Sequence, residues 1–121
     1  MKRFLSCALA LLLTASCKSD GAPSAADIEQ GYVNLAAENT ERAITHFGSL
    51  EDIPPVTLGF IQMTAQVANP RCEKNQNDLG YICLYTLTMV NRLGVALDPL
   101  PDIKARVWQA DVGWMVHEDE G

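Results

Sequence analysis

The chain has 121 residues, a formal net charge of −6 and a hydrophobic content of 48%. This length suits one small domain, and this composition differs from that of intrinsically disordered chains. The acidic balance, with a pI of about 4.7, argues against partners that are bound by neutralising phosphates. No nucleic acid partner is therefore expected.

The first residues have the three-part layout of a secretory signal. Lys2 and Arg3 form a basic start, residues 4–13 form an uncharged apolar run, and small residues then lead to Cys17. A membrane-spanning helix needs roughly 20 apolar residues, and this run is shorter. We therefore expect a leader for export and not a transmembrane helix.

The exit from this leader resembles the lipobox of bacterial lipoproteins. Ala15, Ser16 and Cys17 fit the pattern, whereas Thr14 stands where Leu is commoner. The resemblance implies that residues 1–16 are cleaved away and that Cys17 becomes the acylated first residue. Several fatty acyl chains hold a protein on a membrane almost permanently, because each buried methylene contributes about 0.8 kcal/mol. The alternative is an ordinary cleaved signal with an incidental cysteine.

The lipoprotein resemblance also implies a location. The chain would be lipid-anchored in the cell envelope, and Lys18 after the acylated cysteine favours the outer membrane, with the domain facing the periplasm. Residues 17–23 are polar and rich in small side chains, which is typical of a flexible tether. Residues 24–121 are then expected to form one domain.

The two cysteines of that domain, Cys72 and Cys83, are predicted to form a disulfide. They are an even pair in an oxidising compartment, and closing this loop stabilises the fold by about 3 kcal/mol on the chain-entropy model. The alternative is a redox or metal role. The spacing is too long for a Cys-x-x-Cys motif, and only His46 and His117 are available to complete a zinc site.

The N-terminal part of the domain has a helical pattern. Ser24 and Asp27 form a helix-start signal, and apolar residues recur near a 3.6-residue period up to Phe47. Gly48 is a suitable stop. We predict one long helix or two short helices across residues 25–47.

The rest of the domain is predicted to contain four strands. Alternation from Val56 predicts a strand with a bulge near Gly59 that ends at residues 69–70, followed by a polar loop over 71–80. Residues 81–90 are rich in aromatic and β-branched side chains, which predicts a central strand. Residues 93–100 are expected to form a covering loop. Residues 103–110 and 114–117 are then predicted to form a hairpin that turns at Gly113.

Together these elements predict a two-layer α+β domain with a helix on a four-stranded antiparallel meander. The order of elements, with Cys72, Gly80–Tyr81, Cys83 and Tyr85 before a Gly113–Trp114 hairpin, resembles cystatin-like small periplasmic domains. In such domains a curled sheet wraps one helix. The resemblance spans roughly residues 25–117 and implies no catalytic residues.

The residues that carry enzymatic chemistry are sparse. The serines after Cys17 lie in the tether, at a helix start and just beyond a helix, and none has a nucleophile-elbow motif. His46 suits a helix C-terminus, and His117 precedes an acidic tail. We expect no catalytic residues, no cofactor and no metal site, and no glycine-rich phosphate loop is present.

An aromatic group is the candidate binding surface. Tyr81, Tyr85, Trp108 and Trp114 lie on predicted strands, and the two tryptophans flank the last hairpin, across which they are expected to pair. Aromatic side chains on strands belong more often to the core, so a role in the core is favoured for all four.

The primary hypothesis is a membrane-anchored, periplasm-facing and non-enzymatic interaction module that binds a basic protein partner. Two forms fit this hypothesis equally, an envelope-complex component and an inhibitor or immunity-type protein. The alternative is a small-ligand-binding envelope protein with a pocket between helix and sheet. An enzyme is ranked last.

Overall fold

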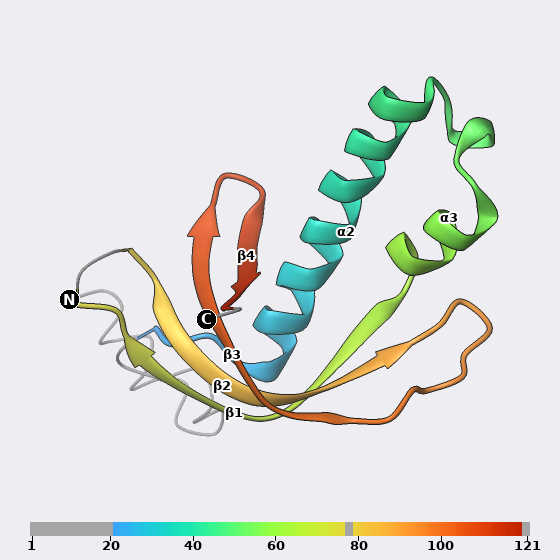
Figure 1. Ribbon diagram of the computed structural model, residues 1–121. Helices are drawn as coiled ribbons and strands as arrows, with labels where there is room; N and C mark the ends of the chain where they lie inside the picture. The colour runs from blue at the N-terminus through green and yellow to red at the C-terminus, as the bar shows by residue number, and fades with distance from the viewer. Residues whose placement is uncertain (1–20, 77–78, 120–121) are drawn as a thin grey trace, which may run out of the picture.

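The computed structural model describes residues 21–76 and 79–119. The helical elements come first in the chain and the four strands follow (Figure 1). Their bounds are α2 Ala25–Phe47, η2 Leu50–Asp52, α3 Pro55–Ile61, β1 Thr64–Lys74, β2 Tyr81–Val90, β3 Leu100–Ala110 and β4 Gly113–Glu118. The sheet is antiparallel with the strand order β1-β2-β3-β4. The predicted α+β class and the meander are confirmed.

Helix α2 is a single helix that begins and ends where the sequence pattern predicts. Ser24 Oγ accepts a hydrogen bond from the amide of Asp27 at 3.1 Å, and Asp27 Oδ2 accepts one from the amide of Ser24 at 3.0 Å. This capping box satisfies two amides that have no partner inside the helix. At the other end, Gly48 has a φ of 101° and donates its amide to the carbonyl of Ile44.

The predicted strand from Val56 is wrong, because this segment forms helix α3 and the first strand begins only at Thr64. The two prolines explain the difference. Pro55 occupies the first helical turn, where its missing amide costs nothing, and the amide of Leu58 bonds the carbonyl of Pro54 at 2.9 Å. Over seven residues, alternation of apolar side chains does not distinguish a strand from a helix.

The bulge and the end of the first strand were also misplaced. The register of β1 against β2 shifts between Ala68 and Arg71, where Asn69 has a φ of 54°, and the strand continues to Lys74. Proline is tolerated on an edge strand or at a bulge, so Pro70 does not end β1. The polar loop therefore begins after Lys74.

The remaining strands follow the prediction closely. Strand β2 has the predicted bounds and lies in the middle of the sheet, β3 begins three residues earlier than expected, and β4 is slightly longer. A second register shift lies between Tyr85 and Leu87, opposite Asp102, whose φ is 58°. Gly113 has a φ of 115° in the last hairpin, as the turn predicts.

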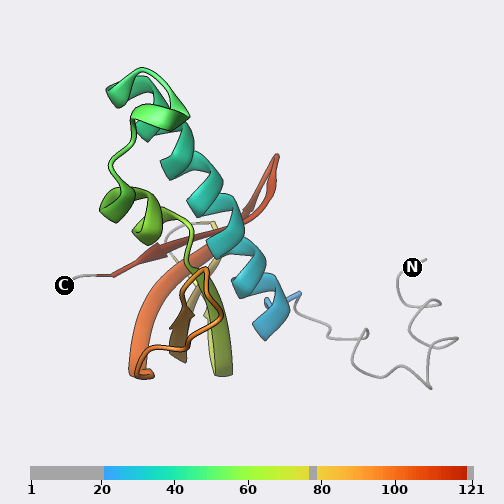
Figure 2. The same cartoon turned by 90° about the vertical axis from the view of Figure 1, so that its right-hand side faces the viewer.

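The core lies between α2 and the concave side of the curved sheet (Figure 1). Alternate residues of β2 face this core, and Ile28 of α2 is fully buried against them. The helix contacts both edge strands, β1 and β4, so the sheet curls around it. Figure 2 shows α3 beside α2, and the two helices are in contact.

Two close contacts set how α2 sits on the sheet. Gly31 approaches Val116 of β4 so closely that a β-carbon on Gly31 would overlap the valine side chain. On the other edge, Glu29 Oε2 accepts a hydrogen bond of 2.8 Å from the amide of Val67 in β1. The helix is thereby held against both edges of the sheet.

Candidate functional site

The predicted disulfide is present. Cys72 of β1 and Cys83 of β2 are partners in register, and their Sγ atoms are 2.08 Å apart. The bond links the edge strand to the central strand close to the core, in which Cys83 is fully buried. The predicted acylation site, Cys17, lies outside the described residues.

The structure does not gather the four predicted surface aromatics into one patch. Tyr81 and Tyr85 face α2 and are only 7% and 2% exposed. Trp114 packs against the same core from β4, where it pairs with Gln109. Trp108 pairs with Met115. The expectation that the two tryptophans pair across the hairpin is therefore wrong. Trp108 therefore lies on the opposite face of the sheet from Trp114.

Charged side chains accompany Trp108 on this outer face. The guanidinium of Arg106 lies 4.6 Å from the centroid of the Trp108 ring, and Arg106 is the register partner of His117. Lys104 forms an ion pair of 3.7 Å with Asp119, and both groups are about half exposed. Exposed pairs of this kind contribute little to stability, and they describe a solvated face.

A chain of hydrogen bonds that the sequence analysis missed joins the two layers. Tyr32 of α2 donates to Glu118 Oε2 of β4 at 2.7 Å, and the hydroxyl oxygens of Tyr32 and Tyr85 are 2.6 Å apart. Because the Tyr32 proton goes to the carboxylate, Tyr85 is the donor to Tyr32. The partners come from α2, β2 and β4, so no single segment of the sequence indicated these hydrogen bonds.

The phenols of Tyr32 and Tyr85 are both neutral at physiological pH. Burial, with a smaller contribution from the charge of Glu118, raises the pKa of Tyr85 to about 12, although its bond to Tyr32 opposes the shift. Burial also raises the pKa of Tyr32 far above its ordinary range. Neutral phenols that already have partners fasten the helix to the sheet, and they are poor nucleophiles and bases.

The two histidines lie on different elements. His46 is in the last turn of α2, with its ring 4.7 Å from that of Phe47, and His117 is on β4. Within residues 21–76 and 79–119, no three His, Cys, Asp or Glu side chains are grouped so that they would hold a metal ion.

A groove at one end of the domain is the candidate functional site. It is a solvent-open hollow of about 250 Å³ between α3 and the turn that follows β2, and we call it the distal groove. Its lining is almost entirely apolar and consists of Pro55, Val56, Gly59, Phe60, Met63, Asn91, Arg92 and Leu93. The groove was not predicted, because the alternation from Val56 predicts a strand where α3 lies.

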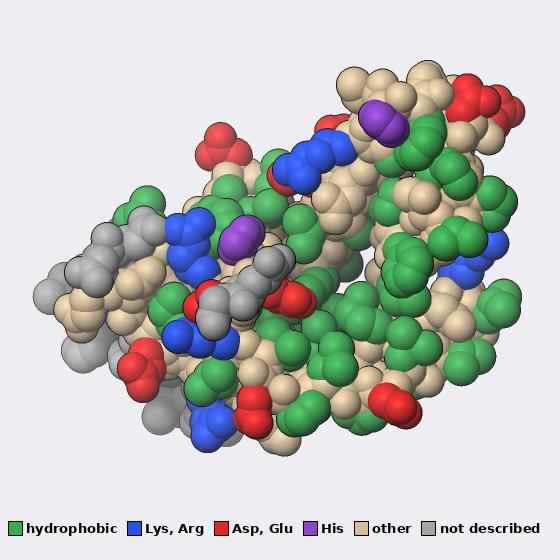
Figure 3. Space-filling model, viewed as in Figure 1, with side chains coloured by type: hydrophobic (Ala, Val, Ile, Leu, Met, Phe, Trp, Pro, Cys, Tyr) green, Lys and Arg blue, Asp and Glu red, His purple; other side chains and the backbone are tan. Residues whose placement is uncertain are grey.

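The apolar side chains at this end are unusually exposed. Val56, Phe60 and Leu93 are 73%, 69% and 82% exposed, and further apolar side chains continue the surface along the β2–β3 connection. The latter are Val95, Leu97 and Leu100. Figure 3 shows hydrophobic side chains gathered over this end of the molecule. Clusters of exposed apolar side chains in soluble domains commonly mark interaction sites.

The turn that forms one wall of the groove is held by its own hydrogen bonds. Asn91 Oδ1 accepts bonds from the amides of Leu93 and Val95 at 2.9 and 3.0 Å, and the amide of Asn91 bonds the carbonyl of Val95. Arg92 Nη1 donates to Gln62 Oε1 at 3.2 Å, which links this wall to the end of α3. The groove is therefore preformed.

Comparison with protein-family models, with curated proteins and with solved structures finds no match to this chain. In the part of the chain that the structure describes, no helix is long and apolar enough to cross a membrane.

Proposed function

We propose that the protein is a lipid-anchored, periplasm-facing lipoprotein that acts as a non-enzymatic interaction module. The observation that carries the interaction role is the distal groove, where large apolar side chains remain exposed on a preformed surface. The anchoring role depends on the leader and on Cys17. An envelope-complex component and an inhibitor or immunity-type protein both fit this function.

The positions of the tether and the groove suit this arrangement. Gly21 lies beside the hydroxyl of Tyr81, at the first residue of β2, whereas the groove begins at Asn91, immediately after the last residue of that strand. A strand of 10 residues is about 30 Å long. An anchor at Cys17 would therefore hold the domain by one end and present the groove at the other.

The alternative function, a ligand pocket between helix and sheet, receives less support. A hollow of about 260 Å³ lies between α2 and the segment that leads into β1, and neither Tyr81 nor Tyr85 lines it. Both tyrosines belong to the predicted aromatic binding group, and both are buried in the core.

Mass measurement of the native protein tests the proposed anchor. The full chain is expressed in a bacterial host, and the protein is extracted from isolated membranes. We expect the mass of a chain that starts at Cys17 and carries acyl groups, and we expect Cys17→Ala to remain unprocessed or to leave the membrane fraction. A native protein that retains its leader, or that is released from membranes by washing without detergent, would refute the anchor.

A further inference from the structure

A second hollow of the molecule lies on the outer face of the sheet, the face away from α2. It has about 430 Å³, it is open to solvent, and we call it the outer hollow. Its lining consists of Ile82, Lys104, Ala105, Arg106, His117 and Asp119. Lysine, arginine and histidine side chains carry N–H donors that suit the oxygens of an anion, and they make up half of this lining.

The strand register brings these donors together. Arg106 of β3 lies between Ile82 of β2 and His117 of β4, which are its partners on the two neighbouring strands. Lys104 is two residues before Arg106 and therefore projects from the same face of β3. The Arg106 guanidinium also rests on the ring of Trp108, 4.6 Å from its centroid, which restricts its motion. A guanidinium held in this way can bind two oxygens of a phosphate at once.

The acids around the outer hollow leave its charge positive. Within the lining, two cations face the single carboxylate of Asp119. Glu118 faces α2 instead, where it accepts the hydrogen bond from Tyr32. On β1, Arg71 and Glu73 lie two residues apart on the outer face, and their charges are opposite. The hollow therefore has an excess of positive charge in a chain whose net charge is −6, and this excess favours an anion.

The outer hollow lies at the end of the sheet where the tether joins the domain. Ile82 follows Tyr81, the first residue of β2, and the hydroxyl of Tyr81 lies beside Gly21. Cys17 is four residues before Gly21, and four residues of chain reach at most about 14 Å. An acylated Cys17 would therefore bring the headgroups of the membrane close to this end of the sheet.

We infer that the outer hollow binds the phosphate group of a membrane phospholipid, an inference that rests on the proposed anchor and gives the domain a second contact with the membrane. Lys104, Arg106 and His117 donate to the phosphate oxygens. With the acyl chains at Cys17 and a headgroup in the hollow, the domain has a fixed orientation. The distal groove, at the other end of β2, then faces away from the membrane.

The tether decides between a lipid and a soluble anion. A free phosphate or an acidic protein would meet the same donors in the outer hollow. A domain anchored beside the membrane, however, encounters headgroup phosphates at a high effective concentration, whereas a soluble anion must bind from dilute solution. The phospholipid is therefore the favoured occupant.

Chemical modification of the two histidines tests the inference on the native acylated protein. Both are exposed, and His117 lies in the outer hollow whereas His46 lies at the far end of α2. The protein is reconstituted into vesicles of digalactosyl diacylglycerol, which contain no phosphate, or into the same vesicles with added phosphatidylglycerol. Diethyl pyrocarbonate then modifies accessible imidazoles, and mass spectrometry gives the rate at each. Phosphatidylglycerol should slow the reaction of His117 at least about fivefold and that of His46 less than about twofold.

Substitution of the cations identifies the contact. Arg106→Gln and, as an independent second variant, Lys104→Gln should each raise the phosphatidylglycerol content that half-protects His117 by about fivefold, which is the effect of one cation at an anionic surface. Circular dichroism of each variant confirms that it is folded. A general effect of the negative membrane surface on the reagent would remain in both variants, so it is distinguished from binding in the hollow.

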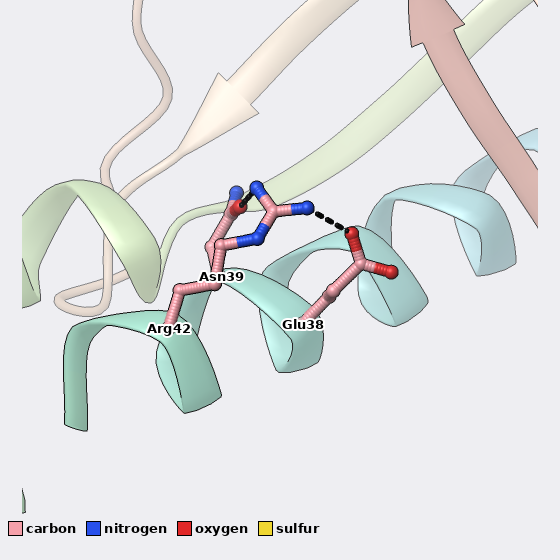
Figure 4. Close-up of polar contacts among 3 residues, drawn as sticks. All are labelled: Glu38, Asn39 and Arg42. Carbon is pink, nitrogen blue, oxygen red and sulfur yellow. Dashed lines mark hydrogen bonds and ion pairs between the residues drawn. The ribbon is translucent and has the colours of Figure 1, made fainter. Parts of the chain in front are cut away.

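Arg42 provides the matched control, because it is a cation on a different face. Its Nη2 forms an ion pair of 2.7 Å with Glu38 on the same helix, and its Nη1 donates to Asn39 at 3.5 Å (Figure 4). Arg42→Gln removes the same charge as Arg106→Gln but leaves the outer hollow intact. It should change the half-protecting content by less than about twofold, since distant exposed charges are screened by salt.

The remaining outcomes also decide the inference. Equal reaction rates of His117 in the two kinds of vesicle, or protection that survives both cation substitutions, would overturn it. Protection by inorganic phosphate without protection by phosphatidylglycerol would assign the hollow to a soluble anion and would overturn the lipid assignment.

Flotation of the same vesicles keeps the proposed anchor separate. A protein that floats with the vesicles but has an unprotected His117 would refute the headgroup contact and leave the anchor standing. A protein that does not float with phosphate-free vesicles, but whose His117 is protected by phosphatidylglycerol, would refute the anchor and leave the headgroup contact standing.

Discussion

Gly31 of α2 and Val116 of β4 are in contact across the helix–sheet interface, with no room for a β-carbon between them. Glycine lowers the intrinsic stability of a helix interior by about 1 kcal/mol relative to alanine. At this position the closer approach of the helix offsets that cost, because it allows the fully buried Ile28 and Val116 to reach the same core.

The Gly31 contact predicts that Gly31→Ala destabilises the protein although alanine favours helices. We expect a loss of about 1–3 kcal/mol in the free energy of unfolding, which is typical of an overpacked core. Urea titration followed by circular dichroism measures it. The control is Gly59→Ala in α3, where a new β-carbon meets no atom within 4 Å, so this variant should gain up to about 1 kcal/mol. Equal effects of the two substitutions would contradict the contact.

The hydrogen-bond chain predicts an order of effects for two conservative substitutions. Tyr32→Phe removes the acceptor of the Tyr85 hydroxyl and leaves that group buried without its partner, which costs about 1–3 kcal/mol. Tyr85→Phe leaves the bond from Tyr32 to Glu118 intact and should cost only about 0.5–1.5 kcal/mol. Equilibrium unfolding of both variants tests the order. A smaller loss for Tyr32→Phe would show that Tyr85 is not the donor.

The buried phenols of the same hydrogen-bond chain predict that the protein loses stability at alkaline pH. The pKa of Tyr85 is about 12 in the folded protein, compared with an ordinary value of 10.0. Between these values the unfolded chain has lost the proton that the folded protein retains, so the unfolded state binds fewer protons and stability falls as the pH rises. The contribution is complete below pH 10 and disappears as the pH passes the folded value.

Unfolding in urea at a series of pH values above neutrality measures this dependence. The Tyr32→Phe/Tyr85→Phe double variant should lose less stability between pH 10 and pH 12 than the unmodified protein, because burial raises the pKa of both phenols in the folded state. Parallel curves for the two proteins would show that neither phenol contributes to the alkaline loss.

Removal of the disulfide is expected to cost about 2–5 kcal/mol of stability. The Cys72→Ala/Cys83→Ala variant should therefore melt at a lower temperature than the oxidised protein, with both measured by calorimetry. Reductant should lower the melting temperature of the unmodified protein and leave that of the variant unchanged. A response of the variant to reductant would point to an effect outside this bond.

Much of the fold follows from local signals in the sequence. Ser24 and Asp27 mark the start of α2, and residues 81–90 are dense in strand-forming side chains and form β2 without any shift of bounds. In each case the local preference and the tertiary packing agree, which makes such segments readable from the sequence alone.

The distal groove was not predicted because the sequence of α3, one of its walls, has no helical pattern of apolar residues. Helix α3 has only seven residues, and its apolar side chains Val56 and Phe60 face solvent, so no buried face imposes a helical period on the pattern. The partners Tyr32 and Glu118 are far apart in the chain, and only the curl of the sheet around α2 brings them together. Strand β1 extends beyond its predicted end at residues 69–70 for a similar reason. Residues 71–74 are held extended by pairing with β2, a tertiary contact that the local sequence does not show.

The hydrogen bond from Val67 to Glu29 also has a consequence for neighbouring molecules. Strand β1 is an outer strand, and an uncovered row of amides invites another chain to add to the sheet. Here the amide of Val67 already donates to the Glu29 carboxylate of α2, and Pro70 has no amide hydrogen to donate. Neighbouring copies of the protein would therefore be less able to join into a continuous β-sheet through the outer edge of β1.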